Sequence, residues 1–242
     1  LKRIAKGGWC QFCSSKELCK QKDCDFCYQK SFDSHPKAKF LLVDTESKPA
    51  RDIFKFSHEE LKFLCQDCNH EFISRPELVS KGNWCSFCSN SQLCPDVNCL
   101  TCFEKSFASS ENSKFWIKTE NIGSPRDYFK FSSRKALFLC IFCGHTINKT
   151  LCSVSSGKWC YFCSSEQLCE QENCNFCYRK SFASHSKAEF WDSEKNIIFP
   201  RFIFKNANQS FWFLCFCGHS IYLLICNVAT GHWCPYCENK KL

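Results

Sequence analysis

The sequence lacks the features that mark several large classes of protein. It holds no run of about 18 apolar residues, the length needed to cross a bilayer, which excludes a membrane-spanning protein. Its first residues, Leu1 to Ile4, form no apolar signal-peptide core, and the chain contains no Met at all. We therefore expect the chain to come from the middle of a longer protein.

Patterns that would indicate catalysis or base recognition are missing as well. We find no paired carboxylates, no nucleophile beside a base and no metal-ligand set with an open position. The chain also lacks the motifs of RRM, KH and C2H2 modules. These absences argue against an enzyme and against a small-molecule substrate. Any catalytic part of the full protein would have to lie upstream of Leu1.

Cysteine is abundant: 25 of the 242 residues. Such a content indicates either a secreted disulfide scaffold or a metal protein. Nine C-x-x-C pairs occur, and this spacing aims two thiolates at one point, whereas a disulfide needs a different separation and torsion. The odd total does not fit full pairing either. The sequence therefore predicts bound Zn²⁺ in a reducing, intracellular setting, which is the nucleus, the cytoplasm or a viral particle or factory.

The cysteines belong to a repeat of about 75 residues. Trp9, Trp84, Trp159 and Trp233 stand 75, 75 and 74 residues apart, and each opens a W-C-x-[FY]-C block. We expect small zinc-stabilised α+β modules, a tandem array of zinc-ribbon or treble-clef repeats with short hairpins and short helices. Residues 1–27 would be the tail of a truncated preceding repeat, followed by zinc repeats at 28–102, 103–177 and 178–242.

Local patterns add expectations for each repeat. A glycine two residues before each Trp predicts a positive φ, at Gly7, Gly82, Gly157 and Gly231. The K-S-F-x-S motif predicts a short helical segment, clearest from Ser181 to Trp191. Residues 53–56 and 61–64 alternate like hairpin strands. Further short helices are expected to begin near Ser14, Ser89 and Ser164.

Two complete sets of four ligands follow from the spacing. A C-x-x-C pair is followed, after 16 intervening residues, by a second pair, and two facing knuckles close a tetrahedron around one ion. Such a closed set favours a structural site over a catalytic one. The two sets are Cys65, Cys68, Cys85 and Cys88, and Cys140, Cys143, Cys160 and Cys163.

The third copy departs from this pattern. It reads C-F-C-G-H from Cys215 to His219, one residue shorter than the others, before Cys234 and Cys237. Because a C-x-C knuckle is cramped, Cys215 pairs with either His219 or Cys217, and the spacing slightly favours His219.

A second element, L-C-x4-C-x2-C, offers three thiolates in each copy and no clear fourth ligand. His35 and His185 lie eight residues past the last cysteine, but the middle copy has Ser110 there. The element is therefore either a second metal site or a loop of reduced, packed cysteines. Its candidate ligands are Cys19, Cys24, Cys27, His35, Cys94, Cys99, Cys102, Cys169, Cys174, Cys177 and His185.

The remaining cysteines and histidines have other expected roles. Cys10 and Cys13 form half of a set, which predicts a knuckle pair about 20 residues upstream in the native protein. Cys152 and Cys226 are expected to be small apolar fillers. The histidines that follow the two complete knuckles are expected beside the metal sets and not in them, at His70 and His145.

The most specific motifs lie in the third copy, at Lys180–Trp191, Phe213–His219 and Gly231–Cys237. They resemble the zinc-ribbon (treble-clef) repeat family of large DNA viruses, some fungi and protists, and bacteria. That family has a helix ending in Trp, a C-x-x-G-H knuckle and a closing C-P-Y-C. The resemblance implies association with nucleic acid, often beside nuclease domains. It also implies a ligand set of Cys215, His219, Cys234 and Cys237.

The resemblance covers all three copies but is looser in the first two. Their knuckles read C-x2-C-[GN]-H, and Ser86 and Tyr161 stand where the family has Pro. The C-x4-C-x2-C element is an addition to the basic pattern.

Charge bears on the partner. The formal net charge is +8, but two all-thiolate zinc sites and one site with a single histidine would lower it to +3. Recurrent basic positions are better evidence, and a phosphate-tracking stripe would require all of them to be exposed on one side of the array. A nucleic-acid-binding array is the leading hypothesis, and a viral or chromatin-associated protein scaffold is the alternative. The stripe comprises Lys30, Arg51, Lys55, Lys105, Arg126, Lys130, Lys180, Arg201 and Lys205.

Overall fold

The computed structural model describes residues 10–43 and 48–238. The chain divides into two compact units, one formed by Leu1–Ser110 and Pro125–Lys130, the other by Glu111–Ser124 and Phe131–Leu242. No helix in the described ranges is long and apolar enough to cross a membrane. Each unit is built from short elements of the kinds that the repeat predicts.

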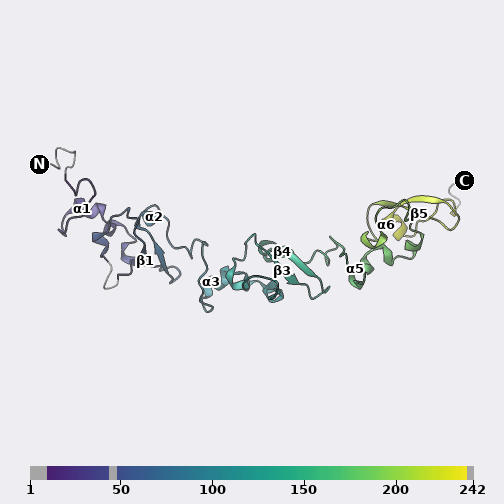
Figure 1. The fold of residues 1–242 in the computed structure, drawn as a ribbon, viewed down its shortest axis with the longest axis horizontal. Coiled ribbons are helices and arrows are strands. Elements are labelled where there is room, and N and C mark those ends of the chain that lie inside the picture. Colours follow the sequence, from purple (N-terminus) through teal and green to yellow (C-terminus); the bar gives the residue numbers. More distant parts are fainter. Residues whose placement is uncertain (1–9, 44–47, 239–242) are drawn as a thin grey trace. The chain divides into compact units, whose positions relative to one another are not determined.

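Two-stranded antiparallel hairpins form the only named sheets in the described residues (Figure 1). In each, a phenylalanine of the first strand faces the core and pairs with an apolar residue of the second: Phe63 with Phe72, Phe138 with Ile147 and Phe213 with Ile221. The strands are β1 (Leu61–Leu64), β2 (Glu71–Ser74), β3 (Lys135–Leu139), β4 (Thr146–Thr150), β5 (Ser210–Leu214) and β6 (Ser220–Leu224).

A five-residue helix follows each hairpin and buries one valine, at Val79, Val154 and Val228. The middle helix has a side-chain cap, because the Thr150 hydroxyl accepts a hydrogen bond from the Ser153 N–H at 3.2 Å. These helices are α2 (Pro76–Ser80), α4 (Leu151–Ser155) and α6 (Ile225–Ala229).

The C-x4-C-x2-C elements run into a second kind of helix, whose N-cap is the middle cysteine of the element. These are α1 (Asp25–Lys30), α3 (Leu100–Lys105) and α5 (Asn175–Lys180). Short 3-10 turns continue the chain, at η2 (Phe32–Ser34), η3 (Ala38–Phe40), η4 (Ala50–Asp52), η5 (Phe107–Ser109), η6 (Glu111–Phe115), η7 (Pro125–Asp127), η8 (Phe182–Ser184), η9 (Ser186–Phe190) and η10 (Pro200–Phe202).

The largest fully buried side chains of the core are phenylalanines. Edge-to-face pairs join the turn after each of these helices to a hairpin, with ring centroids 5.8 Å apart for Phe32 and Phe63 and 5.6 Å for Phe182 and Phe213. Trp84 packs on the same cluster, against Phe63 and Phe72. Six phenylalanines are fully buried: Phe32, Phe63, Phe107, Phe138, Phe182 and Phe213.

Several local predictions are confirmed and others are wrong. The strand at Leu61–Leu64 and the positive φ of Gly82, Gly157 and Gly231 are present, while Gly7 lies outside the described residues. Residues 53–56 are not a strand, because Phe54 makes only a single bridge, to Ser31.

The expected helix from Ser181 to Trp191 is instead two separate 3-10 turns. Ser181 is held in an extended conformation, with ψ 159°, by its bridge to Phe204. The helices expected near Ser14, Ser89 and Ser164 are tight turns. Each ends within two residues at a positive φ that a helix cannot continue through, at Ser15, Asn90 and Ser165.

Candidate metal centres

The first half of each four-cysteine set is the turn of a hairpin. In the first repeat the Cys65 N–H donates to the His70 carbonyl at 2.9 Å, and the Asn69 N–H donates to the Cys65 carbonyl at 2.8 Å. Asn69 takes a φ of +54°, and Gly144 and Gly218 take positive values at the corresponding places. The tight turn brings the side chains of Cys65 and Cys68 to the same side.

The second half comes from the turn after α2, α4 or α6. Gly82, at φ +93°, turns the chain away from α2 and into the segment that carries Trp84 and Cys85. The Ser89 N–H then donates to the Cys85 carbonyl at 3.0 Å, which closes a turn that contains Cys88. The core contacts of Trp84 fix where this turn stands against the hairpin.

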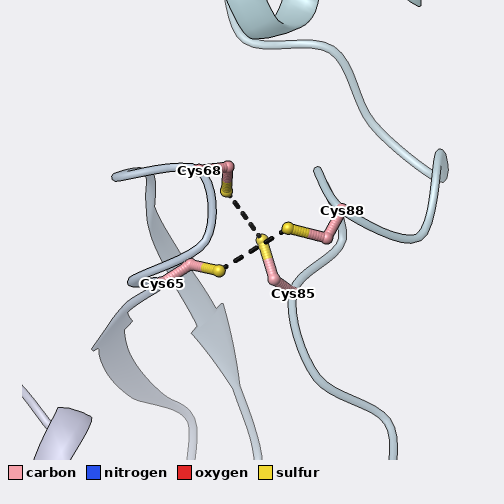
Figure 2. Close-up of side chains that lie close together, drawn as sticks. All are labelled: Cys65, Cys68, Cys85 and Cys88. Atoms are coloured by element: carbon pink, nitrogen blue, oxygen red, sulfur yellow. Dashed lines mark hydrogen bonds between the residues drawn. The ribbon is translucent and has the colours of Figure 1, made fainter.

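The two halves meet as a compact group of four sulfurs (Figure 2). The Sγ atoms of Cys65 and Cys88 lie 3.6 Å apart, and those of Cys68 and Cys85 lie 3.5 Å apart. The second set, at Cys140, Cys143, Cys160 and Cys163, repeats these distances at 3.7 and 3.5 Å. A tetrahedron with metal–sulfur bonds of about 2.3 Å has edges of about 3.8 Å. The protein atoms are therefore spaced to surround one ion.

In the third repeat the structure groups Cys217, not His219, with the other three cysteines. The Sγ atoms of Cys215 and Cys237 lie 3.6 Å apart, and those of Cys217 and Cys234 lie 3.7 Å apart. This grouping favours Cys217 as the fourth member, in place of the slightly preferred His219. The shorter turn is accommodated because Gly218, at φ +83°, still lets the Cys215 N–H reach the His219 carbonyl at 2.9 Å.

His219 nevertheless stays close to this set. Its Nδ1 lies 3.1 Å from the Cys217 Sγ, and its ring stacks on Tyr236 with centroids 4.0 Å apart. The hydrogen bond from His219 lowers the pKa of the Cys217 thiol to about 6. His219 thus contacts Cys217, which belongs to the set, and does not itself belong to it.

A second kind of set, the mixed set, combines the three cysteines of a C-x4-C-x2-C element with a histidine from the hairpin turn. His70 Nε2 lies 3.3 Å from the Cys99 Sγ and 3.5 Å from the Cys102 Sγ. In the other mixed set, His145 Nε2 has the same relation to Cys174 and Cys177, at 3.2 and 3.6 Å. The two mixed sets are His70, Cys94, Cys99 and Cys102, and His145, Cys169, Cys174 and Cys177.

The histidines that complete the mixed sets are not the ones that the sequence favours, and the favoured histidines lie elsewhere. His70 and His145, expected beside the metal sets, lie within them. His35 and His185, the expected candidates, stack on Phe32 and Phe182, and each Nδ1 accepts a backbone N–H two residues on. The sequence holds a signal for this grouping: His70 and His145 both stand 24 residues before the first cysteine of an element.

The first element has the same local geometry as the other two. The Cys19 N–H donates to the Cys27 Sγ at 3.4 Å, as in Cys94 to Cys102 and Cys169 to Cys177. The knuckle pair expected upstream of Cys10 and Cys13 lies outside the described residues. Cys152 and Cys226 lie half-buried on α4 and α6.

The thiols lie close enough together to shift one another's pKa. Burial and the neighbouring Cys140 and Cys160 thiols raise the pKa of Cys163 to about 11. Burial also acts to raise the pKa of Cys169, but hydrogen bonds from His145, Cys174 and Arg201 lower it to about 6. All four groups of one set can ionise together only with a cation among them. All 25 cysteines are free thiols in the structure, consistent with such a use.

Three of the six lysines of the expected stripe bind the cysteine-bearing turns. Lys105 Nζ donates to the carbonyls of Phe87 and Cys88 at 2.6 and 3.4 Å. Lys180 Nζ donates to the carbonyls of Phe162 and Cys163 at 2.7 and 2.8 Å. Lys30 contacts the turn that holds Cys13 in the same way. These ammonium groups hold the cysteine-bearing turns by hydrogen bonds to their backbone carbonyls.

The recurrent arginines are directed at the C-x4-C-x2-C loops. Arg126 Nη2 donates to the Asp96 carbonyl at 3.0 Å, and Arg201 Nη2 donates to the Gln171 carbonyl at 2.7 Å. Arg51 Nη2 donates to the Gln21 carbonyl at 3.0 Å. Of the nine stripe positions only Lys205 is exposed, and the other eight are half-buried. The exposure that a phosphate-tracking stripe requires is therefore not found.

Comparison with known proteins gives a viral relative. Over 158 residues, 62% of this chain, the sequence is 37% identical to an uncharacterised protein of Acanthamoeba polyphaga mimivirus. The match spans 38% of that protein's length. No protein-family model matches the chain. The chain is thus similar to part of a viral protein, and that protein's name states no function.

Proposed function

We propose that the chain is a structural array that folds around bound zinc and presents its repeats to a protein partner. The observation that carries this proposal is the closure of the metal sets. At least five groups of four Cys and His side chains converge within 4.8 Å of one another, and each supplies a full tetrahedral shell from protein atoms. Such a shell leaves no position for water or substrate, as expected of a structural site and not of a catalytic one.

Zinc is the metal that best matches these ligands. Four thiolates, or three thiolates and an imidazole, in tetrahedral arrangement are typical of structural zinc sites. Short hairpins and five- or six-residue helices bury little surface by themselves. Because each structural zinc contributes on the order of 10 kcal/mol to folding, the metal would supply the stability that such small cores lack.

Charge and contacts favour a protein partner over nucleic acid. Three four-cysteine sets would each remove two charges and two mixed sets would each remove one, which lowers the formal net charge from +8 to zero. The recurrent lysines at the knuckles and the recurrent arginines are already hydrogen-bonded within the modules. A loaded array therefore has little electrostatic attraction for a polyanion.

Exposed apolar side chains, by contrast, recur in every repeat. A leucine at the end of the first hairpin strand is 37%, 45% and 53% exposed at Leu64, Leu139 and Leu214. An exposed aromatic recurs on the helices that follow the C-x4-C-x2-C elements, at Tyr28, Phe103 and Tyr178. Side chains of this kind that serve no core are typical of protein contact surfaces.

Metal analysis tests the structural role. We expect at least five zinc ions per purified chain by elemental analysis, and loss of the hairpin and near-ultraviolet circular dichroism signals when a strong chelator is added. Zinc should restore both signals. Fewer than two zinc ions per chain, or an unchanged spectrum after complete metal removal, would refute the proposed function.

Binding to unrelated nucleic acids tests the alternative. We expect fluorescence anisotropy with DNA and RNA probes of about 20 nucleotides, single- and double-stranded, to show no more than weak binding at about 150 mM salt. Affinity that falls steeply with added salt, and that drops alike for all probes when Lys205 and other exposed lysines are neutralised, would favour the nucleic-acid array instead.

A further inference from the structure

One arginine in each repeat has buried hydrogen-bond donors that no protein atom accepts. Arg51, Arg126 and Arg201 lie in the 3-10 turns η4, η7 and η10 and reach back 30 residues in sequence. In each of them, Nε and Nη1 are buried and have no hydrogen-bond partner in the protein. A buried guanidinium with unused donors is costly unless a negative group stands beside it.

A cysteine sulfur lies close enough to two of these guanidinium groups to be that negative group. Arg126 Nη2 lies 3.6 Å from the Cys94 Sγ, and Arg201 Nη2 lies 3.5 Å from the Cys169 Sγ. These are the first cysteines of the two mixed sets. A thiol is a weak acceptor, whereas a metal-bound thiolate is charged and accepts hydrogen bonds from cationic donors far more strongly.

The charges also balance. Three thiolates and a neutral imidazole around Zn²⁺ carry a net charge of −1, and one guanidinium brings the local sum to zero. The four-cysteine sets differ, because their lysines contact backbone carbonyls of the knuckle and not sulfur. The arginine is thus specific to the mixed sets.

We propose that Arg126 and Arg201 are positioning residues that neutralise the two mixed metal centres through N–H···S hydrogen bonds to Cys94 and Cys169. This rests on the proposed function, since it requires metal in those sets. Each arginine keeps the first cysteine of its set oriented toward the ion and lowers the cost of burying the anionic centre. Arg51 has the same relation to the loop of Cys19 through the Gln21 carbonyl.

The same arginine joins its metal centre to the core that follows it. Arg201 stands in η10, two residues before Ile203, whose carbonyl accepts the Phe182 N–H at 2.7 Å. Phe182 is fully buried, and Ile203 belongs to the same core cluster. Loading of the set at Cys169 therefore also anchors the turn that leads into the third repeat's core.

Substitution of Arg201 by Gln in the full chain tests the proposal. It removes the cation and keeps a polar side chain. We expect one zinc ion of the chain to be lost to a chelator about 10- to 100-fold more readily, the effect typical of outer-shell partners. The double variant Arg126→Gln/Arg201→Gln should release two. Arg179→Gln is the matched control, because Arg179 is exposed on α5, close in sequence to Cys177.

Cobalt substitution identifies which ion is affected. Co²⁺ bound by three sulfurs and a nitrogen has visible bands distinct from those of Co²⁺ bound by four sulfurs. We expect the mixed-ligand component alone to weaken in Arg201→Gln. Arg201→Lys, which keeps the charge without the planar fork, should fall between the wild type and Arg201→Gln and guards against a variant that fails to fold.

The outcomes separate the two proposals. Wild-type protein that binds five or more metals with a mixed-ligand component, but in which Arg201→Gln behaves like Arg179→Gln, would overturn the arginine role and leave the metal array intact. Equal weakening of every site in Arg201→Gln would also overturn it, because that indicates general loosening. Wild-type protein without a mixed-ligand component would instead refute the mixed sets themselves.

Discussion

The four-cysteine sets and the mixed sets use the same hairpin in different ways. A four-cysteine set takes both halves from one repeat, within 24 residues from Cys65 to Cys88. A mixed set takes its histidine from the hairpin turn and its cysteines from the next helix, α3 or α5, and the segment just before it. A four-cysteine set joins the hairpin turn to the turn after the short helix that follows the hairpin. A mixed set joins the hairpin turn to the start of the next helix, α3 or α5.

This difference shows that one hairpin turn can contribute side chains to two sets of candidate ligands. In the second repeat, Cys140 and Cys143 face one set while His145, two residues further on, faces the other. The third repeat has the first kind of site and a similar turn, but His219 stacks on Tyr236 beside its own cysteines. A repeat can therefore form its four-cysteine set whether or not the histidine of the hairpin turn belongs to a mixed set.

Loss of a four-cysteine set should have the largest effect. Replacing Cys140 and Cys160 by Ser removes two ligands, and we expect loss of one zinc ion and of the folded β3–β4 hairpin, since a structural zinc is worth on the order of 10 kcal/mol. Zinc content and the protection of β3 and β4 amides from hydrogen exchange measure this. Cys152→Ser, on α4, is the control and should retain all metal. Retained protection in the double variant would show that the hairpin folds without its ion.

Loss of the histidine should have a smaller effect than loss of a four-cysteine set. We expect His145→Ala to lose the metal of its mixed set while the β3–β4 hairpin stays protected, because the four cysteines of the neighbouring set are intact. Zinc content and hydrogen exchange of the hairpin amides measure both effects. The matched control is His185→Ala, which removes the other candidate histidine. If His185→Ala lost the mixed-ligand metal and His145→Ala kept it, the assignment of the fourth ligand would be reversed.

The third repeat gives the finest contrast. Cys217→Ala should release the zinc of its set, whereas His219→Ala should retain it with an affinity reduced by about 10- to 100-fold, because the histidine acts through the sulfur. Zinc content and chelator competition of the two variants give the answer. Loss of the ion in His219→Ala together with its retention in Cys217→Ala would restore the ligand set that the family resemblance implies.

The sequence was sufficient for the repeat and for the two complete four-cysteine sets, because spacing along the chain directly limits which thiolates can meet. It was insufficient for the fourth member of the mixed sets. Their closeness in sequence to the cysteines favours His35 and His185, but the turn after each helix directs them onto Phe32 and Phe182. The histidine that completes each set comes from an earlier hairpin, and only its constant distance of 24 residues from the element indicates this.

The basic stripe illustrates a different limit. Recurrence of Lys105 and Lys180, or of Arg126 and Arg201, is expected both for a binding surface and for contacts inside each repeat. Sequence does not show which atoms accept their hydrogen bonds, and here the acceptors are knuckle carbonyls and cysteine sulfurs. Recurrence identified the positions that matter, but burial and hydrogen bonding were needed to assign their role.

The most direct test of the two kinds of metal site is zinc K-edge X-ray absorption on protein whose metal content has been counted by native mass spectrometry. We expect at least five zinc ions per chain and a coordination shell dominated by sulfur at about 2.3 Å, with a minor contribution from histidine nitrogen. Three zinc ions with sulfur alone would contradict the account, because the metal would then be confined to the four-cysteine sets.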